Sequence, residues 1–315
     1  MARLLSVVSR VVVASILGVV VAATGASSAA GAAAPYPVPY DFLTSAVLAG
    51  LRVDADPPGA NIWGCRPSTA HPEPVVLVHG TGGNKNDNWQ TFAPLLANNG
   101  YCVYAFTYGV LPGAGLPLNQ VGGLAPIESS AQQMAAFVTK VLAATGAARV
   151  DIVGHSQGTF MPDYYAKFLG GANKIDKYVS LAPLWHGTNL LEAGTLMTLG
   201  AAYGFHVDER AFGAGAQMLA GSQFVAKLRS GGTPAVAGIT YTNIVTAHDE
   251  LVVPYTSGIE SGMTNIVVQH QCGLDLSDHL ELVADPVAAA DVLNALDPAH
   301  PRPVPCRLVL PFGVV

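Results

Sequence analysis

A serine near the middle of the chain follows a short apolar run in a pattern that few folds accommodate. Residues 150–153 are apolar apart from Asp151, and Gly154-His155-Ser156-Gln157-Gly158 comes directly after them. In a Gly-x-Ser-x-Gly nucleophile elbow the serine occupies a strained turn between a buried strand and a helix, and the glycines let neighbouring backbone pass close by. The turn lifts the hydroxyl clear of the sheet. The sequence therefore predicts that Ser156 is a nucleophile carried by an α/β fold.

Short apolar runs alternate with amphipathic segments along the whole chain. We expect strands at 75–78, 101–106, 150–153, 178–181, 240–245 and 265–268. Helices are expected at 89–96, around 134–142, from the elbow toward Leu169, and at 287–296. Unbroken apolar strands separated by helices indicate a mostly parallel sheet that is covered on both faces. With 315 residues, 50% of them hydrophobic, the chain is long enough for one α/β domain with a large core.

Two segments interrupt this alternation. Residues 185–230 are rich in Gly, Ala, Leu and Met, which predicts a helical insertion over the core, compatible with a mobile cap over the site. The loop at 110–126 also combines glycines with large apolar side chains and is a second candidate cover.

The N-terminus has the pattern of a secretory signal peptide. Arg3 and Arg10 precede an apolar run at 11–23, and small residues follow it. The run is short for a membrane span of about 20 residues, which favours a cleaved signal over a retained anchor. We therefore expect a signal peptide at 1–30, a catalytic domain at 31–315, and a secreted protein.

Charge and cysteine content exclude some classes of function. The net charge is −6 and no basic stripe is present, so nucleic-acid binding is not expected. The four cysteines form no Cys-x-x-Cys pair, which argues against a zinc site. In an exported protein they predict two disulfides; three pairings are possible, of which the nearest-in-sequence pairing, Cys65–Cys102 and Cys272–Cys306, is favoured.

A serine nucleophile needs an acid and a base, which follow it in the order Ser, Asp or Glu, His in parallel-sheet hydrolases. Asp249 comes just after the expected strand 240–245, at the carboxyl edge of the sheet, and Glu250 beside it is the alternative acid. Three other aspartates fit less well. Asp163 is expected to face outward from the helix after the elbow, Asp176 begins a strand, and Asp208 lies in the insertion.

The candidate base is His279, on the loop after the last expected strand. His270 abuts that strand and His300 lies in a Pro-rich tail, so both are weaker candidates. His155, beside the nucleophile, is interpreted as a packing residue.

The tetrahedral intermediate of acyl transfer requires preorganised donors for its oxyanion. One is the backbone N–H of Gln157, the residue after the nucleophile. The other is expected from the loop after the first strand, where Thr81 offers a backbone N–H and a hydroxyl. The same glycine-rich loop does not match a phosphate-binding loop, because no Gly-Lys-Ser/Thr follows it.

Together these motifs resemble those of the class 2 lipases, secreted α/β-hydrolases that cleave lipid esters. The matching stretches are Val75-Val76-Leu77-Val78-His79-Gly80-Thr81-Gly82-Gly83-Asn84 with Asn88-Trp89, the elbow, His248-Asp249-Glu250-Leu251-Val252-Val253-Pro254-Tyr255, and Asp278-His279. The fungal lipase B group is a more distant likeness, with a disulfide placed like Cys65–Cys102. The resemblance implies a Ser156–Asp249–His279 triad with Thr81 and Gln157 as the oxyanion hole, and no metal or other cofactor.

On this basis we expect a secreted serine ester hydrolase, a triacylglycerol lipase or carboxylesterase working through an acyl-enzyme. Its partner would be a lipid or ester substrate at a lipid–water interface, with no obligate protein partner. An acyltransferase of the same fold and a catalytically dead secreted binding protein are the alternatives.

Overall fold

The computed structural model describes residues 34–190 and 213–313. The chain divides into a short unit, Met1–Ala34, and a compact unit, Pro35–Val315, which carries every element discussed below. The expected signal peptide and the middle of the expected insertion, 191–212, lie outside the described residues. Within those described, no helix is both long enough and apolar enough to span a bilayer.

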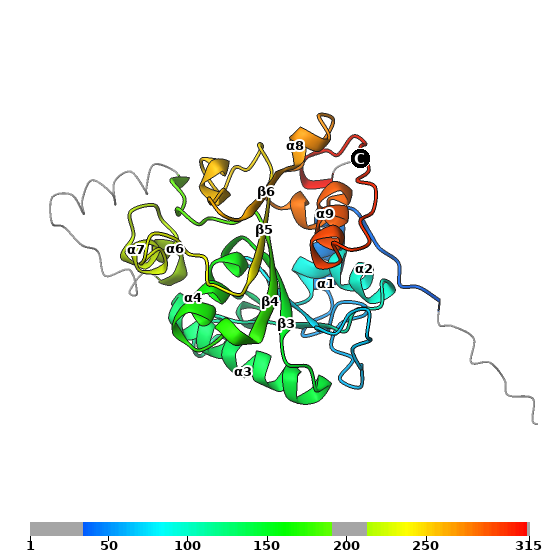
Figure 1. The fold of residues 1–315 in the computed structure, drawn as a ribbon, viewed down its shortest axis with the longest axis horizontal. Coiled ribbons are helices and arrows are strands. Elements are labelled where there is room, and N and C mark those ends of the chain that lie inside the picture. Colours follow the sequence, from blue (N-terminus) through cyan, green and yellow to red (C-terminus); the bar gives the residue numbers. More distant parts are fainter. Residues whose placement is uncertain (1–33, 191–212, 314–315) are drawn as a thin grey trace, which may run out of the picture. The chain divides into compact units, whose positions relative to one another are not determined.

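Six parallel strands form one sheet in the order β2-β1-β3-β4-β5-β6, and β3 to β6 are labelled side by side in Figure 1. They are β1 (Val75–Val78), β2 (Val103–Phe106), β3 (Val150–His155), β4 (Ile175–Leu181), β5 (Thr240–Val245) and β6 (Thr264–Val267). The expected parallel sheet is confirmed. Because β1 pairs with β2 on one side and β3 on the other, the strand order reverses between β1 and β3. Ligands bind at the carboxyl ends of the strands at such a switch point, and the elbow and the candidate oxyanion loop both begin there.

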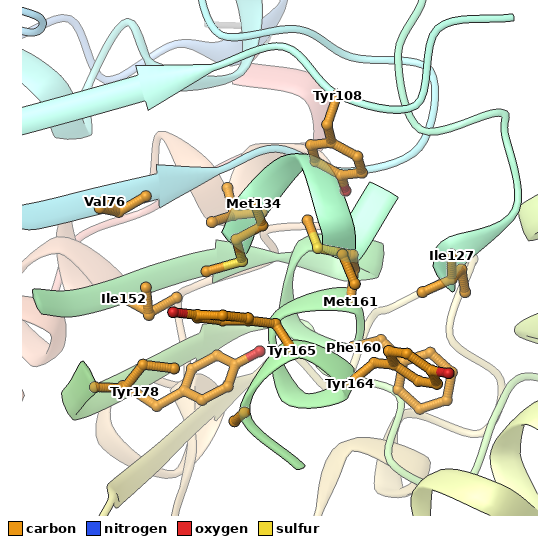
Figure 2. Close-up of a cluster of buried hydrophobic side chains, with 14 of the residues drawn as sticks. Val76, Tyr108, Ile127, Met134, Ile152, Phe160, Met161, Tyr164, Tyr165 and Tyr178 are labelled. Atoms are coloured by element: carbon orange, nitrogen blue, oxygen red, sulfur yellow. The ribbon is translucent and has the colours of Figure 1, made fainter. Parts of the chain in front are cut away.

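Helices cover both faces of the sheet. Helices α3 (Ile127–Thr145) and α4 (Met161–Phe168) lie on one face, and α2 (Phe92–Asn98) and α9 (Pro286–Leu296) lie on the other (Figure 1). Figure 2 shows the first layer, in which Met134 of α3 and Tyr165 of α4 lie beside the strand residues Val76, Ile152 and Tyr178. Alternate strand residues, such as Leu77 and Val179, face the second layer. The alternation follows from the pleat, which sends successive side chains to opposite faces.

Local signals account for where these helices start and stop. Helix α3 ends at Gly146, whose φ of 76° is the left-handed conformation that glycine adopts without strain. The Asp285 carboxylate caps α9 by accepting the N–H groups of Val287 and Ala288. Pro162 occupies the first turn of α4, where its missing N–H costs nothing.

The described ends of the expected insertion pack on the core. Helices α6 (Gly213–Gln217) and α7 (Gln223–Leu228) bury Ala214, Phe224 and Leu228 against the layer that contains α3 and α4. A bridge between Thr188 and Leu219 joins the two ends of the segment.

Both disulfides follow the nearest-in-sequence pairing. Cys65–Cys102 joins the segment before β1 to the start of β2, and Cys272–Cys306 joins the end of α8 (Val268–Gln271) to the C-terminal segment. The bridges connect residues 37 and 34 positions apart. Closing loops of this size in the unfolded chain contributes about 4 kcal/mol each in the chain-entropy model.

Candidate active site

The turn after β3 has the backbone that a nucleophile elbow requires. Ser156 has a φ of +53°, which is strained for a residue with a side chain. A Cβ on Gly154 would lie 2.1 Å from the Gly158 carbonyl oxygen, and one on Gly158 would lie 2.0 Å from the Val78 carbonyl oxygen. Glycine is therefore the only residue that fits at these two positions, and the turn holds Ser156 at the carboxyl edge of the sheet.

The imidazole of His279 is paired with a buried carboxylate. Its Nδ1 lies 2.9 Å from both carboxylate oxygens of Asp249, and both side chains are 2% exposed. Asp249 Oδ1 also accepts the backbone N–H groups of Leu251 and Val252, at 3.0 and 2.7 Å. A carboxylate only accepts, so in the neutral imidazole the proton resides on Nδ1 and Nε2 keeps its lone pair. His279 is thus held in the tautomer that can take up a proton.

Two side chains hold the backbone of His279: Glu250, the neighbour of Asp249, and His155, the neighbour of Ser156. Its N–H donates to Glu250 Oε2 at 3.1 Å, and its carbonyl oxygen lies 3.1 Å from His155 Nε2. Glu250, the alternative acid, therefore contacts the main chain of His279, while Asp249 contacts the imidazole. This contact is invisible in the sequence, because the two residues come from different loops.

His155 does more than pack. Its Nδ1 lies 3.1 Å from Asn88 Oδ1, and that oxygen accepts the Gly80 N–H at 3.1 Å. Burial, together with His279, holds the pKa of His155 well below its usual range, so the ring is neutral. A neutral ring carries one proton, and both partners are acceptors, so His155 hydrogen-bonds one of them at a time. His155 thereby connects the loop after β1 to the loop that carries His279.

The loop after β1 is braced by buried groups. Thr81 Oγ1 donates to Gln157 Oε1 at 2.7 Å, which joins the two candidate oxyanion residues. His79 is buried, which lowers its pKa to about 4. Its Nδ1 donates to the Gly80 carbonyl at 2.7 Å, and its Nε2 accepts the Tyr108 N–H at 3.2 Å. Neutral His79 therefore satisfies both contacts at once.

The loop 110–126 packs against the loop after β1 through its glycines. Gly122 exchanges backbone hydrogen bonds with Gly82 and Gly83, each 2.9 Å long. A Cβ on Gly123 would lie 2.7 Å from Gln157 Oε1. Of the described residues that line the cavity at Ser156, none comes from 110–126. Residues 110–126 therefore form no part of the cavity wall in this structure, and Gly122 and Gly123 instead pack against the oxyanion residues.

Ser156 and His279 line one cavity of about 700 Å³ with mostly apolar walls. Thr81 of the loop after β1 and Met218, which follows α6, line the cavity. Residues from the loops after β4 and β5 also line it. Helix α1 (Phe42–Gly50), which the sequence analysis did not identify, forms part of the wall. Asp87 also lines it, and burial raises the pKa of this carboxyl to about 6. Within 34–190 and 213–313, no group of His, Cys, Asp and Glu residues has the composition of a metal site.

The remaining candidates lie elsewhere. His270 and His300 are exposed, and His300 pairs with Asp297. Asp163 does not face outward as expected: it is buried on the inner side of α4 and accepts the hydroxyl of Tyr241, a β5 residue, at 2.8 Å. Asp176 lies near the start of β4 and pairs with Arg149. Asp208 lies outside the described residues.

The chain matches a protein-family model over most of the folded unit. The model described as "Lipase (class 2)" matches residues 72–290. Triacylglycerol lipases of Pseudarthrobacter phenanthrenivorans and Burkholderia plantarii are each 34% identical over 98 residues, or 30% of this chain. The matched part spans 28% and 25% of the length of these two relatives.

Solved structures show the same fold. Aspergillus fumigatus lipase B superposes with a TM-score of 0.58 at 21% identity, covering 79% of this chain and 56% of that one. The mature form of a Bacillus licheniformis lipase superposes with a TM-score of 0.54 at 14% identity, covering 73% and 94%. With the parallel sheet, these similarities identify the α/β-hydrolase fold.

Proposed function

Because the chain belongs to the class 2 lipase family, we propose that it is a secreted serine carboxylic ester hydrolase whose substrates are lipid esters such as acylglycerols. The observation that carries the proposal is the pairing of His279 with buried Asp249 on the wall of the cavity that also holds Ser156. An orienting acid, a base with a free lone pair and a serine on a strained turn are the three groups that nucleophilic acyl transfer needs.

In the proposed reaction, Ser156 Oγ attacks the ester carbonyl while His279 Nε2 takes up the hydroxyl proton. Asp249 keeps the imidazole oriented and stabilises the imidazolium that forms. The backbone N–H groups of Thr81 and Gln157 stabilise the oxyanion of the tetrahedral intermediate. His279 then gives its proton to the leaving alcohol, and an acyl group remains on Ser156. Water, activated by the same histidine, attacks this acyl-enzyme and releases the acid.

The cavity supports an ester of an apolar acid or alcohol as substrate. Its walls are mostly apolar, and Ser156, His279 and Thr81 lie among them as the groups that would fix the reacting carbonyl. A lipid–water interface is the natural source of such esters. We include export in the proposal, with residues 1–30 as signal peptide and 31–315 as the catalytic domain. Two disulfides support an oxidising destination.

Hydrolysis of a soluble p-nitrophenyl ester by the purified protein tests the proposal. Ser156→Ala, His279→Ala and Asp249→Ala should each lower kcat by about 10⁴-fold or more, and double variants should lose little further, because the residues act as a unit. His300→Ala is the control and should behave as wild type. Near-full activity in Asp249→Ala together with a large loss in Glu250→Ala would contradict the assignment of the acid. Adding a competing alcohol distinguishes hydrolysis from acyl transfer, since a transferase would form mainly the new ester.

A further inference from the structure

Helix α1 lies before the region that the family model matches, and it carries no charged residue. Its sequence, FLTSAVLAG, has only Thr44 and Ser45 as polar side chains. The Asp41 side chain caps the helix by accepting the Thr44 N–H at 3.1 Å. A helix this short is marginal alone, so its position depends on contacts with the rest of the protein.

Two buried polar side chains hold α1 at its two ends. Glu281 Oε2 accepts the Phe42 N–H at 3.0 Å, and Glu281 closely follows His279 in sequence. At the other end, Asn86 Nδ2 donates to the Ala49 carbonyl at 2.9 Å, and Asn86 lies on the loop after β1. The two loops that carry the candidate base and the candidate oxyanion hole thus also fix α1.

One side of α1 forms part of the cavity wall. Phe42, Ala46 and Val47 line the cavity that contains Ser156, with Leu280 beside them. Leu43 and Leu48 are exposed and do not line it. A polar group of a ligand placed against this wall would lose its hydration and find no hydrogen-bond partner. A hydrocarbon chain would gain, by about fourfold in binding for each methylene buried.

We propose that α1 is the wall of a subsite for a hydrocarbon chain of the ester, and that Ala46 and Val47 determine how long a chain it takes. The inference rests on the proposed ester hydrolase function. The chain could belong to the acid or to the alcohol of the ester, because both present the same methylene groups to the wall.

Two substitutions alter the wall in opposite directions. Ala46→Leu adds an isopropyl group and should displace about two methylenes, which lowers the long-chain to short-chain ratio of kcat/KM about 16-fold. Val47→Ala removes two methyl groups and should raise the ratio about fourfold. The controls lie on the same helix and off the cavity. Thr44→Leu places the same leucine side chain at an exposed position off the cavity. Leu48→Ala truncates a side chain that is 57% exposed, a fraction close to the 59% of Val47.

The ratio is measured in two substrate series. One varies the acyl chain of p-nitrophenyl esters, and the other varies the alcohol chain of acetate esters. A change confined to the acyl series assigns the subsite to the acid, and one confined to the alcohol series assigns it to the alcohol. Binding of a pyrene-labelled fatty acid to the same variants in a Ser156→Ala background gives a readout that needs no turnover, and Ala46→Leu should weaken this binding about 16-fold.

Unchanged ratios in both series for Ala46→Leu and Val47→Ala, with unchanged pyrene binding, would overturn the inference, as would equal changes in the controls. If Ala46→Leu does not fold, Val47→Ala decides alone. If the wild type cleaves no ester while α1 variants alter pyrene binding, the proposed function fails and the subsite stands.

Discussion

Replacing His155 by Phe tests whether this residue positions the catalytic groups or only fills space. Phenylalanine keeps a ring of similar size and removes both nitrogens, which lie 3.1 Å from the His279 carbonyl and 3.1 Å from Asn88 Oδ1. Losing the partner of a buried polar group costs about 1–3 kcal/mol. Glu250 still accepts the His279 N–H, so the His279 loop stays in place, but its carbonyl loses its partner. We therefore expect part of this cost to appear as a small displacement of the His279 imidazole. A displacement costing about 1.4 kcal/mol in the transition state lowers kcat about tenfold.

The assay is steady-state hydrolysis of a soluble short-chain ester, with thermal unfolding measured in parallel. The value of kcat should fall more than KM rises, since both nitrogens of His155 face protein acceptors and offer nothing to the substrate. Asn88→Ala should couple to His155→Phe in a double-mutant cycle, because the two side chains act through one contact. The exposed His270 provides a control as His270→Phe. A folded His155→Phe with kcat within twofold of wild type would refute the positioning role.

Three further perturbations follow from the structure. Thr81→Val should lower kcat of the soluble ester about tenfold and leave KM nearly unchanged, and Thr81→Ser should retain most activity, since the hydroxyl orients the oxyanion loop. Burial raises the pKa of Asp163 to about 7, so its stabilising contribution is greatest below about pH 4 and is lost as pH rises to about 7. Asp163→Asn keeps an acceptor for Tyr241 and should show a flatter dependence of unfolding free energy on pH across that range in urea titrations. Mild reduction of Cys272–Cys306 should lower activity before far-UV circular dichroism changes, because the bridge lies just before the His279 loop; simultaneous loss of both signals would contradict this.

The strands were predictable from sequence because parallel strands buried on both faces appear as continuous apolar runs. The residues of β1 are all buried, and its predicted bounds match the structure. The start of β4 was missed because Asp176 and Lys177 are polar and half-buried at the amino edge of the sheet, where they pair with each other. Burial on both faces begins only at Tyr178, and the apolar pattern begins there too.

The candidate site was predictable where its chemistry is local in sequence and not where it depends on folding. The elbow, the oxyanion loop, Asp249 and His279 each carry a short motif. Helix α1 does not: its place on the cavity depends on the contact of Phe42 with Glu281, 239 residues apart. The only signal was an uncharged apolar run behind Asp41. Likewise, Asp163 was misjudged because its partner, Tyr241, is 78 residues away.

Acid-quenched peptide mapping with a slowly hydrolysed ester tests whether Ser156 carries the acyl group during turnover. We expect an acyl adduct on the peptide that contains Ser156. The adduct should accumulate in His279→Ala no faster than in wild type. In Ser156→Ala, both the adduct and ester hydrolysis should be absent. Turnover by Ser156→Ala at the wild-type rate, or an adduct on any other residue, would exclude Ser156 as the nucleophile.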